Sequence, residues 1–336
     1  MFSAVRLSSK CIFSKLLGFM LEEVFMMEDG VGRVREMLQG SRLAAILKVQ
    51  GTALRSIGEF MHREGFVQLM PVVVSPVTDP LCHSVYDASV DYAGQRLSLT
   101  KSMIMHKQVA VSSPHLPRIY IISPNVRLEK EHMRSSGRHL LEFSQVDIEM
   151  REVRKDGFIA LMERLLRRVV EDVKREREAE LEMLGRRLEV PEIPFRRFES
   201  KEAGREHGEE YEAALSGSMR QPFWVMDHAR EFYDREDPER KGYYHNYDLV
   251  YPGGFGEALS GGERDWEYDV LRRKMAERGQ GEESFGPYLE MAKRGWLVPS
   301  AGGGLGVERL VRYLAGVKDI AEVSPFAKVP GERIVL

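Results

Sequence analysis

The spacing of apolar residues along the chain predicts alternating helices and strands. Residues 42–64 predict an amphipathic helix that ends at Gly65, because their apolar residues recur three or four positions apart. These residues are Leu43, Ile46, Leu47, Leu54, Ile57, Phe60 and Met61. The next run, FVQLMPVVVSP, predicts a strand, and Pro71 places it at a sheet edge or an interface because proline cannot donate a ladder hydrogen bond.

Residues 123–150 predict two strands joined by a strongly charged loop. In the second strand apolar and polar residues alternate, with Val146, Ile148 and Met150 on one face and Phe143, Gln145, Asp147 and Glu149 on the other. The same alternation places Arg127 and Glu129 of the first strand beside the polar face. That face suits either solvent or a charged ligand with a flat ring, since a guanidinium binds phosphate and Phe143 offers a stacking surface.

The remaining pattern is mostly helical. Residues 158–188 predict a long helix, residues 190–220 are loop-rich around Pro191 and Pro194, and residues 222–227 predict a buried strand. Charges of both signs alternate between Lys174 and Arg187, which favours a solvated helix face over an RNA-binding patch.

Two glycine-rich segments carry candidate chemistry. In residues 247–271, Glu257 and Ser260 offer hard oxygen ligands suited to magnesium, and Arg264 can bind a carboxylate, although such a segment alone is typical of a turn. Residues 302–316, GGGLGVERLVRYLAG, predict a strand end that leads into a helix. Arg309 lies in the first turn of that helix, where anions are favoured.

Composition narrows the class of protein. The 336 residues suffice for one large domain or two ordinary ones, and 49 basic against 52 acidic residues give a net charge of -3, which argues against a global basic surface. Charged residues make up 30% and asparagine occurs only at Asn125 and Asn246, a bias typical of thermophiles. Cys11 and Cys82 form neither a disulfide framework nor a zinc-site spacing, which predicts a reducing, cytoplasmic compartment.

The N-terminal segment has two interpretations. Residues 1–19 carry basic residues and no acidic residue, which indicates either a targeting segment or a plain extension. No apolar run approaches the roughly 20 residues needed to span a bilayer, so we expect no membrane association.

Three of these stretches together resemble the motifs of class II aminoacyl-tRNA synthetases, in particular the aspartyl/asparaginyl branch. The helix at 42–64 and its following strand are similar to motif 1, where the family forms its dimer interface. The order R-x-E, loop, R-H-x-x-E-F, from Arg127 to Phe143, resembles motif 2, and residues 302–316 resemble motif 3. The resemblance implies an α+β fold, an antiparallel β-sheet flanked by helices, and a homodimer. The ending PFAKVPG departs from the family's F-P-R-x-P-G.

The resemblance also implies an ATP site with magnesium. Arg127 would neutralise the α-phosphate, Arg309 and His139 would hold the outer phosphates, and Glu129 would read the adenine amino group. In the family's G-E-x-x-S-G-x-x-R run the glutamate and serine bind magnesium, which implies Glu257 and Ser260 here. The implied ATP-binding residues are Arg127, Glu129, Arg138, His139, Phe143, Glu257, Gly306 and Arg309, of which Arg127 and Arg309 would be catalytic.

The implied amino-acid site is of the aspartate type. The segment LTKSMIMHKQ resembles the family's S-P-Q-L-x-K-Q, whose lysine contacts the substrate's side-chain carboxylate. Lys107 matches this lysine, whereas Ile104 stands where the family has a glutamine. The implied substrate-binding residues are Lys107, Gln145, Asp147, Arg264 and Asp79.

The expected activity follows from what precedes motif 1. Only about 40 residues do so, too few for an OB-type anticodon-binding domain, so we expect residues 1–40 to be an extension of unknown role and residues 41–336 the catalytic domain. This shape resembles the archaeal asparagine synthetases related to asparaginyl-tRNA synthetase. They use ATP to convert L-aspartate to an aspartyl-adenylate, which ammonia turns into L-asparagine with release of AMP, so tRNA would be an unlikely partner.

Two alternatives stay open. The first is a truncated synthetase paralogue that transfers an aminoacyl group to a tRNA or protein acceptor. The second is a non-catalytic regulatory subunit, which the joint presence of Arg127, Glu257, Arg264 and Arg309 argues against.

Overall fold

The computed structural model describes residues 30–229 and 231–334. Most of the predicted extension 1–40, with the candidate targeting segment, therefore lies outside the described residues. No helix in the described part of the chain is both long and apolar enough to cross a membrane.

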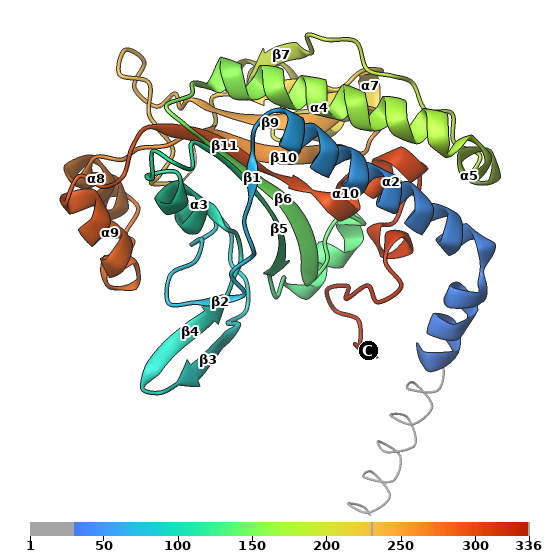
Figure 1. Ribbon diagram of the computed structural model, residues 1–336, viewed down its shortest axis with the longest axis horizontal. Helices are drawn as coiled ribbons and strands as arrows, with labels where there is room; N and C mark the ends of the chain where they lie inside the picture. The colour runs from blue at the N-terminus through green and yellow to red at the C-terminus, as the bar shows by residue number, and fades with distance from the viewer. Residues whose placement is uncertain (1–29, 230, 335–336) are drawn as a thin grey trace, which may run out of the picture.

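The chain is built on an antiparallel-rich sheet of eight strands in the order β1-β5-β6-β11-β10-β9-β8-β7, as far as the described residues show (Figure 1). Its strands are β1 (Val67–Gln68), β5 (Arg118–Val126), β6 (Glu142–Arg151), β7 (Arg196–Glu199), β8 (Phe223–Met226), β9 (Asn246–Tyr251), β10 (Gly256–Glu263) and β11 (Ser300–Gly306). The outer pairs β1–β5 and β7–β8 are parallel, and the inner pairs are antiparallel. A smaller sheet contains β2 (Val74–Ser75), β4 (Gln95–Leu99) and β3 (Ser89–Tyr92). The predicted α+β class, with an antiparallel sheet flanked by helices, is confirmed.

The helices surround this sheet. Within the described residues they include α2 (Ser41–Arg63), α3 (Ile104–Ala110), α4 (Lys155–Glu176), α5 (Glu178–Met183), α6 (Ser200–His207), α7 (Tyr211–Ser218), α8 (Tyr268–Glu277), α9 (Gly286–Lys293) and α10 (Val307–Ala315). Short 3-10 turns lie at Glu131–Ser136, Glu283–Phe285 and Ile320–Val323.

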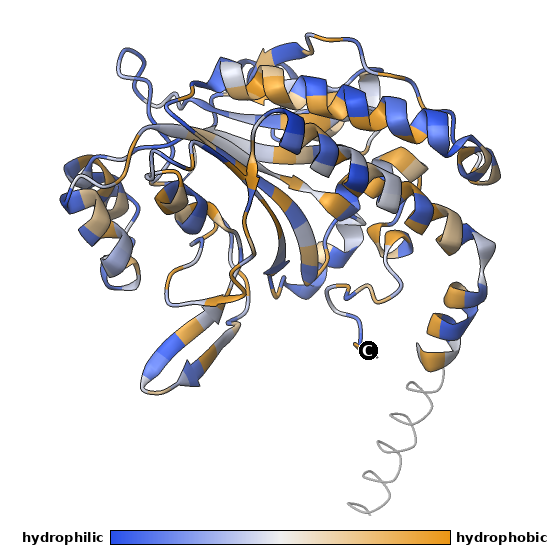
Figure 2. Ribbon diagram, in the orientation of Figure 1, coloured by the Kyte–Doolittle hydropathy of each residue, from blue (hydrophilic) through white to orange (hydrophobic). Residues whose placement is uncertain are grey.

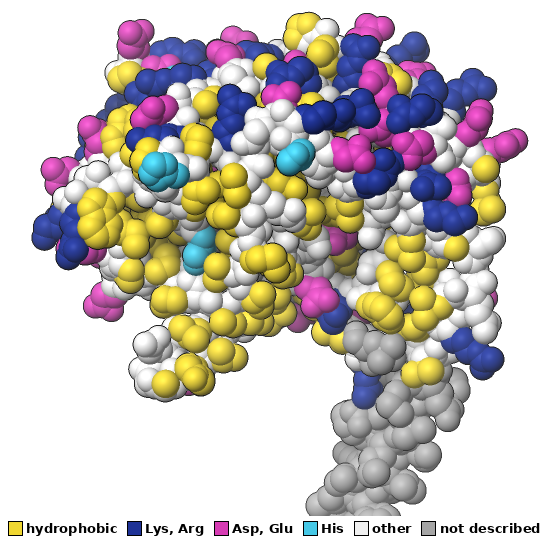
Figure 3. All heavy atoms as spheres, viewed as in Figure 1, with side chains coloured by type: hydrophobic (Ala, Val, Ile, Leu, Met, Phe, Trp, Pro, Cys, Tyr) yellow, Lys and Arg dark blue, Asp and Glu magenta, His cyan; other side chains and the backbone are white. Residues whose placement is uncertain are grey.

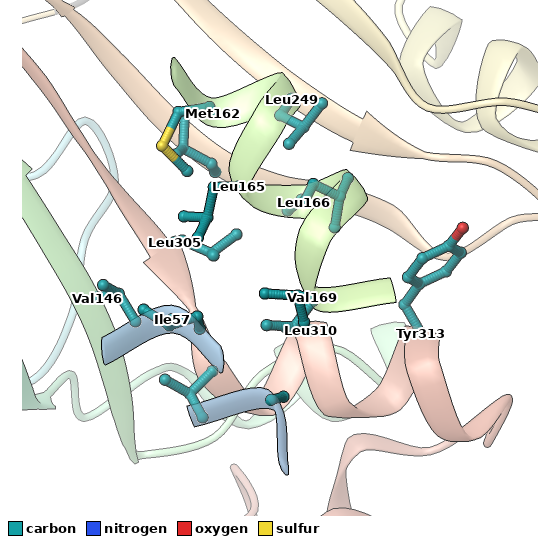
Figure 4. Close-up of a cluster of buried hydrophobic side chains, with 14 of the residues drawn as sticks. Ile57, Val146, Met162, Leu165, Leu166, Val169, Leu249, Leu305, Leu310 and Tyr313 are labelled. Carbon is teal, nitrogen blue, oxygen red and sulfur yellow. The ribbon is translucent and has the colours of Figure 1, made fainter. Parts of the chain in front are cut away.

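One face of the sheet is covered by α2, α4 and α10, which together bury the main hydrophobic core (Figure 4). Ile57 of α2, Leu165 of α4 and Leu310 of α10 pack with Val146 of β6 and Leu305 of β11. Hydrophobic stripes are visible on these helices in Figure 2. Because successive strand residues point to opposite faces, covering one face leaves the polar residues of β6 on the other face, where the site forms.

Three local predictions need correction. The predicted strand at residues 66–76 is two short strands, β1 and β2, which belong to different sheets, and Pro71 lies between them. The helix expected at 158–188 is α4 followed by α5, with Arg177 between them at φ -123° and ψ 31°. The segment 190–220 contains β7, α6 and α7, because residues such as Ala203 and Leu215 bury themselves against Phe223 and Val250 of the sheet.

Glycines in β10 and β11 allow adjacent strands and side chains to approach closely. A Cβ built on Gly261 would lie within 3.0 Å of Gly302 O, Tyr247 Cε2 and Gly303 Cα, so neighbouring backbone would have to move. By contrast, a Cβ on the exposed Gly51 of α2 would meet nothing within 4 Å.

We therefore expect opposite effects from two glycine-to-alanine changes. Gly261→Ala should lower the free energy of unfolding by roughly 1–3 kcal/mol through overpacking. Gly51→Ala should raise it by up to about 1 kcal/mol, because glycine is unfavourable inside a helix. Urea denaturation of the two variants and the parent protein measures both changes, and equal stability of Gly261→Ala and the parent would show that the strands are not so closely packed.

Candidate active site

A cavity of about 480 Å³ lies on the polar side of the sheet. Its wall is built by β6, β10 and β11, by α3 and the start of α10, by the turn at Glu131–Ser136 and by residues of the loop near Asp79. Every residue that the sequence analysis assigned to ATP, substrate or magnesium lines it: Asp79, Lys107, Arg127, Glu129, Arg138, His139, Phe143, Gln145, Asp147, Glu257, Ser260, Arg264, Gly306 and Arg309. The structure therefore brings together residues separated by up to 230 positions in the sequence.

Lys107 and Asp147 form a buried ion pair at one end of the cavity. Lys107 is 2% exposed, and its Nζ donates to Asp147 Oδ1 and to the carbonyl oxygen of Gly303, each at 3.0 Å. Ser123 Oγ donates to the other Asp147 oxygen at 2.7 Å. A buried charge is costly unless it has such partners. The packing of α3 against β6 supplies them, because it brings Lys107 next to Asp147.

Arg264 is held beside this pair by two carboxylates. Its Nε donates to Glu149 Oε1 at 3.3 Å and its Nη1 to Asp234 Oδ1 at 3.2 Å. Burial by itself lowers the pKa of Arg264, but the carboxylates of Glu149 and Asp234 raise it by more than burial lowers it. The pKa is therefore raised overall, and the guanidinium stays charged. Glu149 also lies 3.8 Å from Lys107 Nζ, which joins both cations in one network.

Glu149 and Asp234 are partners that the sequence analysis did not assign to the site. Glu149 shares the polar face of β6 with Asp147, so the alternation that identified Asp147 could have found it. Asp234 follows β8 in an irregular segment, where no periodicity signals its direction.

The same irregular segment adds Glu231 and Tyr233 to the cavity wall. Tyr233 donates its hydroxyl hydrogen to Asp79 Oδ1 at 3.3 Å. Burial, together with the nearby carboxylates of Asp79 and Asp234, raises the pKa of Glu231 to about 7. This end of the cavity thus combines two buried cations with a larger number of carboxylates, which suits a ligand that carries both carboxylate and ammonium groups.

The other end of the cavity is rich in cations. The Arg127 guanidinium lies 5.1 Å from the centre of the Phe143 ring, and its Nε donates to the carbonyl oxygen of Lys101 at 3.0 Å. Arg309 Nη1 contacts Glu257 Oε1 at 3.0 Å. Burial and then the positive charge of Arg309 lower the pKa of Arg138. Arginines held near each other in this way favour a polyanion such as a phosphate chain.

A β-bulge brings the predicted magnesium ligands to the cavity. Residues three apart on a regular strand face opposite sides of the sheet, yet Glu257 and Ser260 both line the cavity. The pairing of β10 with β9 shifts between Glu257 and Leu259, and this extra residue reverses the side-chain direction. A carboxylate and a hydroxyl on one side of the strand, beside the arginine cluster, fit a hard cation bound with phosphate.

Residues 32–330 match the family model of class II tRNA synthetases (D, K and N). The chain is 32% identical over 317 residues to the aspartate–tRNA(Asp/Asn) ligase of Methanothermobacter thermautotrophicus, covering 87% of this chain and 68% of that protein. It is 27% identical over 311 residues to the asparagine–tRNA ligase of Thermoplasma acidophilum, covering 87% of this chain and 70% of that protein. The asparaginyl-tRNA synthetase of Pyrococcus horikoshii, solved with asparaginyl-adenylate, superposes with a TM-score of 0.80 at 25% identity, covering 88% of this chain and 71% of that one.

The environment of His139 predicts a pH effect on stability. Burial, followed by the positive charge of Arg309, lowers its pKa to about 4. An unfolded imidazole has a pKa of about 6.5, so between pH 4 and this value the unfolded chain binds more protons and the free energy of unfolding falls as the pH drops. His139→Gln should remove this part of the acid sensitivity in denaturation curves between pH 7 and pH 4. His115→Gln serves as the control, because His115 is exposed. Identical pH profiles for the two variants would contradict the lowered pKa of His139.

Proposed function

Since this chain belongs to the class II tRNA synthetase family of the aspartate, lysine and asparagine type, we propose that it activates an amino acid, most simply aspartate, by reaction with ATP. The activated amino acid would then be transferred to an acceptor. The proposal rests chiefly on the two ends of one cavity, where Lys107 and Arg264 lie at one end and Arg127 and Arg309 at the other.

The charges of the site support adenylate formation. A substrate carboxylate oxygen attacks the α-phosphorus of ATP, an acyl phosphate bond forms, and pyrophosphate leaves. Arg127 would neutralise charge on the α-phosphate, and Arg309 and Arg138, which line the same cavity, would hold the outer phosphates. Phe143, already stacked with Arg127, offers a face for adenine. Glu257 and Ser260 would hold magnesium, which supplies further neutralisation of the phosphates.

Aspartate is supported by the charge of the amino-acid end. Lys107 and Arg264 both present cations to the cavity, which suits a substrate with two carboxylates, and Asp79 and Asp147 can face its ammonium group. The buried pair between Lys107 and Asp147 keeps the lysine in place before substrate arrives.

The expected acceptor of the activated amino acid changes from ammonia, which the sequence analysis favoured, to tRNA. Matching relatives are named as tRNA ligases, so the prediction that tRNA is an unlikely partner is not supported. These relatives therefore favour a synthetase paralogue, which passes its aminoacyl group to a tRNA or protein acceptor, over an ammonia-dependent asparagine synthetase. We propose tRNA as the acceptor to test first.

One observation keeps the asparagine synthetase as a second candidate. Ile104, which stands in place of the family's glutamine, is 3% exposed and lines the cavity beside Lys107, so the amino-acid end differs from the family pattern. Making asparagine would require aspartate to bind reversed, with its side-chain carboxylate toward ATP and its α-carboxylate at Lys107 and Arg264.

We also propose a homodimer in the cytoplasm. Apolar side chains gather over β1–β4 on the molecular surface (Figure 3), and Met70, in the segment between β1 and β2, is 85% exposed. Light scattering of the purified protein should give twice the mass of the 38.5 kDa chain, and a single-chain mass would refute the dimer.

Loss of Arg309 should impair amino-acid activation. Arg309→Ala should lower aspartate-dependent exchange of pyrophosphate into ATP by about 10²–10³-fold, because a cation that stabilises the phosphates in the transition state is removed. The control is Arg205→Ala on α6, whose side chain is 74% exposed, and which should exchange at the parental rate. Exchange undiminished in Arg309→Ala would show that the phosphates bind elsewhere.

The acceptor can be identified by giving one preparation of the purified protein tRNA in one reaction and ammonium in another. With radiolabelled aspartate, ATP, magnesium and total tRNA, the proposal predicts label bound to tRNA. Free asparagine formed from ammonium without tRNA would instead establish the second candidate, and it would overturn tRNA as the acceptor.

A further inference from the structure

Three side chains that can bind a metal converge next to the cavity, and the proposed activation uses none of them. They are Glu212 in the first turn of α7, His228 in the segment after β8, and Asp248 in β9. One ligand atom of each, a carboxylate oxygen or an imidazole nitrogen, lies within 4.8 Å of the other two. Asp248 is 1% exposed and His228 is 8% exposed, so both groups are largely withdrawn from water.

His228 is held so that one ring nitrogen is directed at Asp248. The Tyr211 hydroxyl lies 3.3 Å from Nδ1, and Nε2 lies 3.3 Å from Asp248 Oδ2. The backbone of His228 is fixed as well, because its N–H donates to Asn246 Oδ1 at 2.7 Å and its carbonyl oxygen accepts from Asn246 Nδ2 at 2.9 Å. A partner on the second ring nitrogen is the usual way in which proteins orient a histidine that binds a metal.

The spacing of the ligand atoms suits a small divalent metal. Zinc binds imidazole nitrogen and carboxylate oxygen at roughly 2.0–2.2 Å, so two ligands of a tetrahedral centre lie about 3.3 Å apart. The distance between His228 Nε2 and Asp248 Oδ2 has this value, 3.3 Å. Glu212 is half-buried, and its flexible side chain can bring the carboxylate to the third position. The two carboxylates also carry negative charge that a divalent cation would balance.

The cluster borders the cation-rich end of the cavity. Asp248 lies opposite Ser260 in the pairing of β9 with β10, so the two side chains share one face of the sheet, and Ser260 lines the cavity. Burial chiefly lowers the pKa of Arg138, and Glu212 is among the carboxylates that oppose this shift. Glu257 and Ser260, the residues assigned above to magnesium, lie on the neighbouring strand β10 and form a different group of ligands.

We propose that Glu212, His228 and Asp248 bind a divalent transition metal, of which zinc is the simplest candidate. An imidazole nitrogen beside carboxylate oxygens favours such a metal over magnesium or calcium, which prefer oxygen ligands. Three protein ligands leave at least one coordination position for water or for an oxygen of a bound molecule. Because the ligands come from α7, from the segment after β8 and from β9, the metal would also join the helix to the sheet. The site does not depend on the proposed amino-acid activation.

The test measures zinc binding by the full-length protein without ATP or amino acid. After removal of metals with a chelator, calorimetric titration with zinc chloride should show a site that persists in a large excess of magnesium. Glu212→Gln keeps the size of the side chain and removes its charge, and it should weaken binding by at least about tenfold. Glu210→Gln removes the same charge two residues away, from an exposed position, and should bind zinc like the parent.

Two further measurements locate the metal. Zinc should raise the melting temperature of the parent, because it binds the folded chain, and this rise should be smaller in Glu212→Gln. Cobalt(II) in the same site should give visible absorption bands that Glu257→Gln keeps and His228→Ala loses. Circular dichroism shows whether His228→Ala is folded, and if it is not, the two glutamine variants of α7 decide.

Three results would overturn the site. One is a parent protein that binds no zinc, and another is equal zinc affinity in Glu212→Gln, Glu210→Gln and the parent. The third is zinc binding that is lost in Glu257→Gln but kept in Glu212→Gln, which would place the metal at the residues assigned to magnesium. None of these results bears on pyrophosphate exchange, so the proposed function is tested separately.

Discussion

The site depends on the compensation of two buried cations. Lys107 lies on α3 and Arg264 directly follows β10. Lys107 pairs with Asp147 of β6, and Arg264 pairs with Glu149 of β6 and with Asp234 in the segment after β8. A buried charge left without its partner destabilises a protein by about 3–5 kcal/mol, so the lysine and the arginine cannot easily take other positions. The network therefore fixes α3, β6 and β10 relative to one another, and it defines the end of the cavity that would bind the amino acid.

The glycines of β10 and β11 allow this network to form inside a sheet. A Cβ at Gly302 would collide with the Glu149 carboxylate, and one at Gly304 would press on Gln145 and Asp147. The absence of side chains here leaves room for long polar side chains to lie across the sheet. On the opposite face β6 carries Val146 and Ile148 into the core and β11 carries Leu305, so the strands that form the site also support the packing.

The cation-rich end of the cavity follows a different constraint. Arg138, His139 and Arg309 lie close enough for the arginines to disfavour a charged imidazole, and Glu257 partly balances them. Their mutual repulsion is a cost in the free protein that a bound polyanion would relieve. This arrangement suits a ligand whose charge is opposite to its own, whereas the end of the cavity at Lys107 and Arg264 contains charges of both signs.

Much of this could be predicted from the sequence because its causes are local. The period-two alternation of residues 143–150 identified the hairpin and its polar face, and the helical spacing of residues 42–64 identified α2, since both follow from backbone geometry alone. The motif resemblance named residues that do share one cavity. Only the tertiary structure decided which partners complete them, because Glu149 and Asp234 meet their partners across the sheet or between loops. The division of residues 66–76 between two sheets, and the bulge that turns Glu257 and Ser260 to one side, likewise arise from strand pairing over long distances, which no local pattern records.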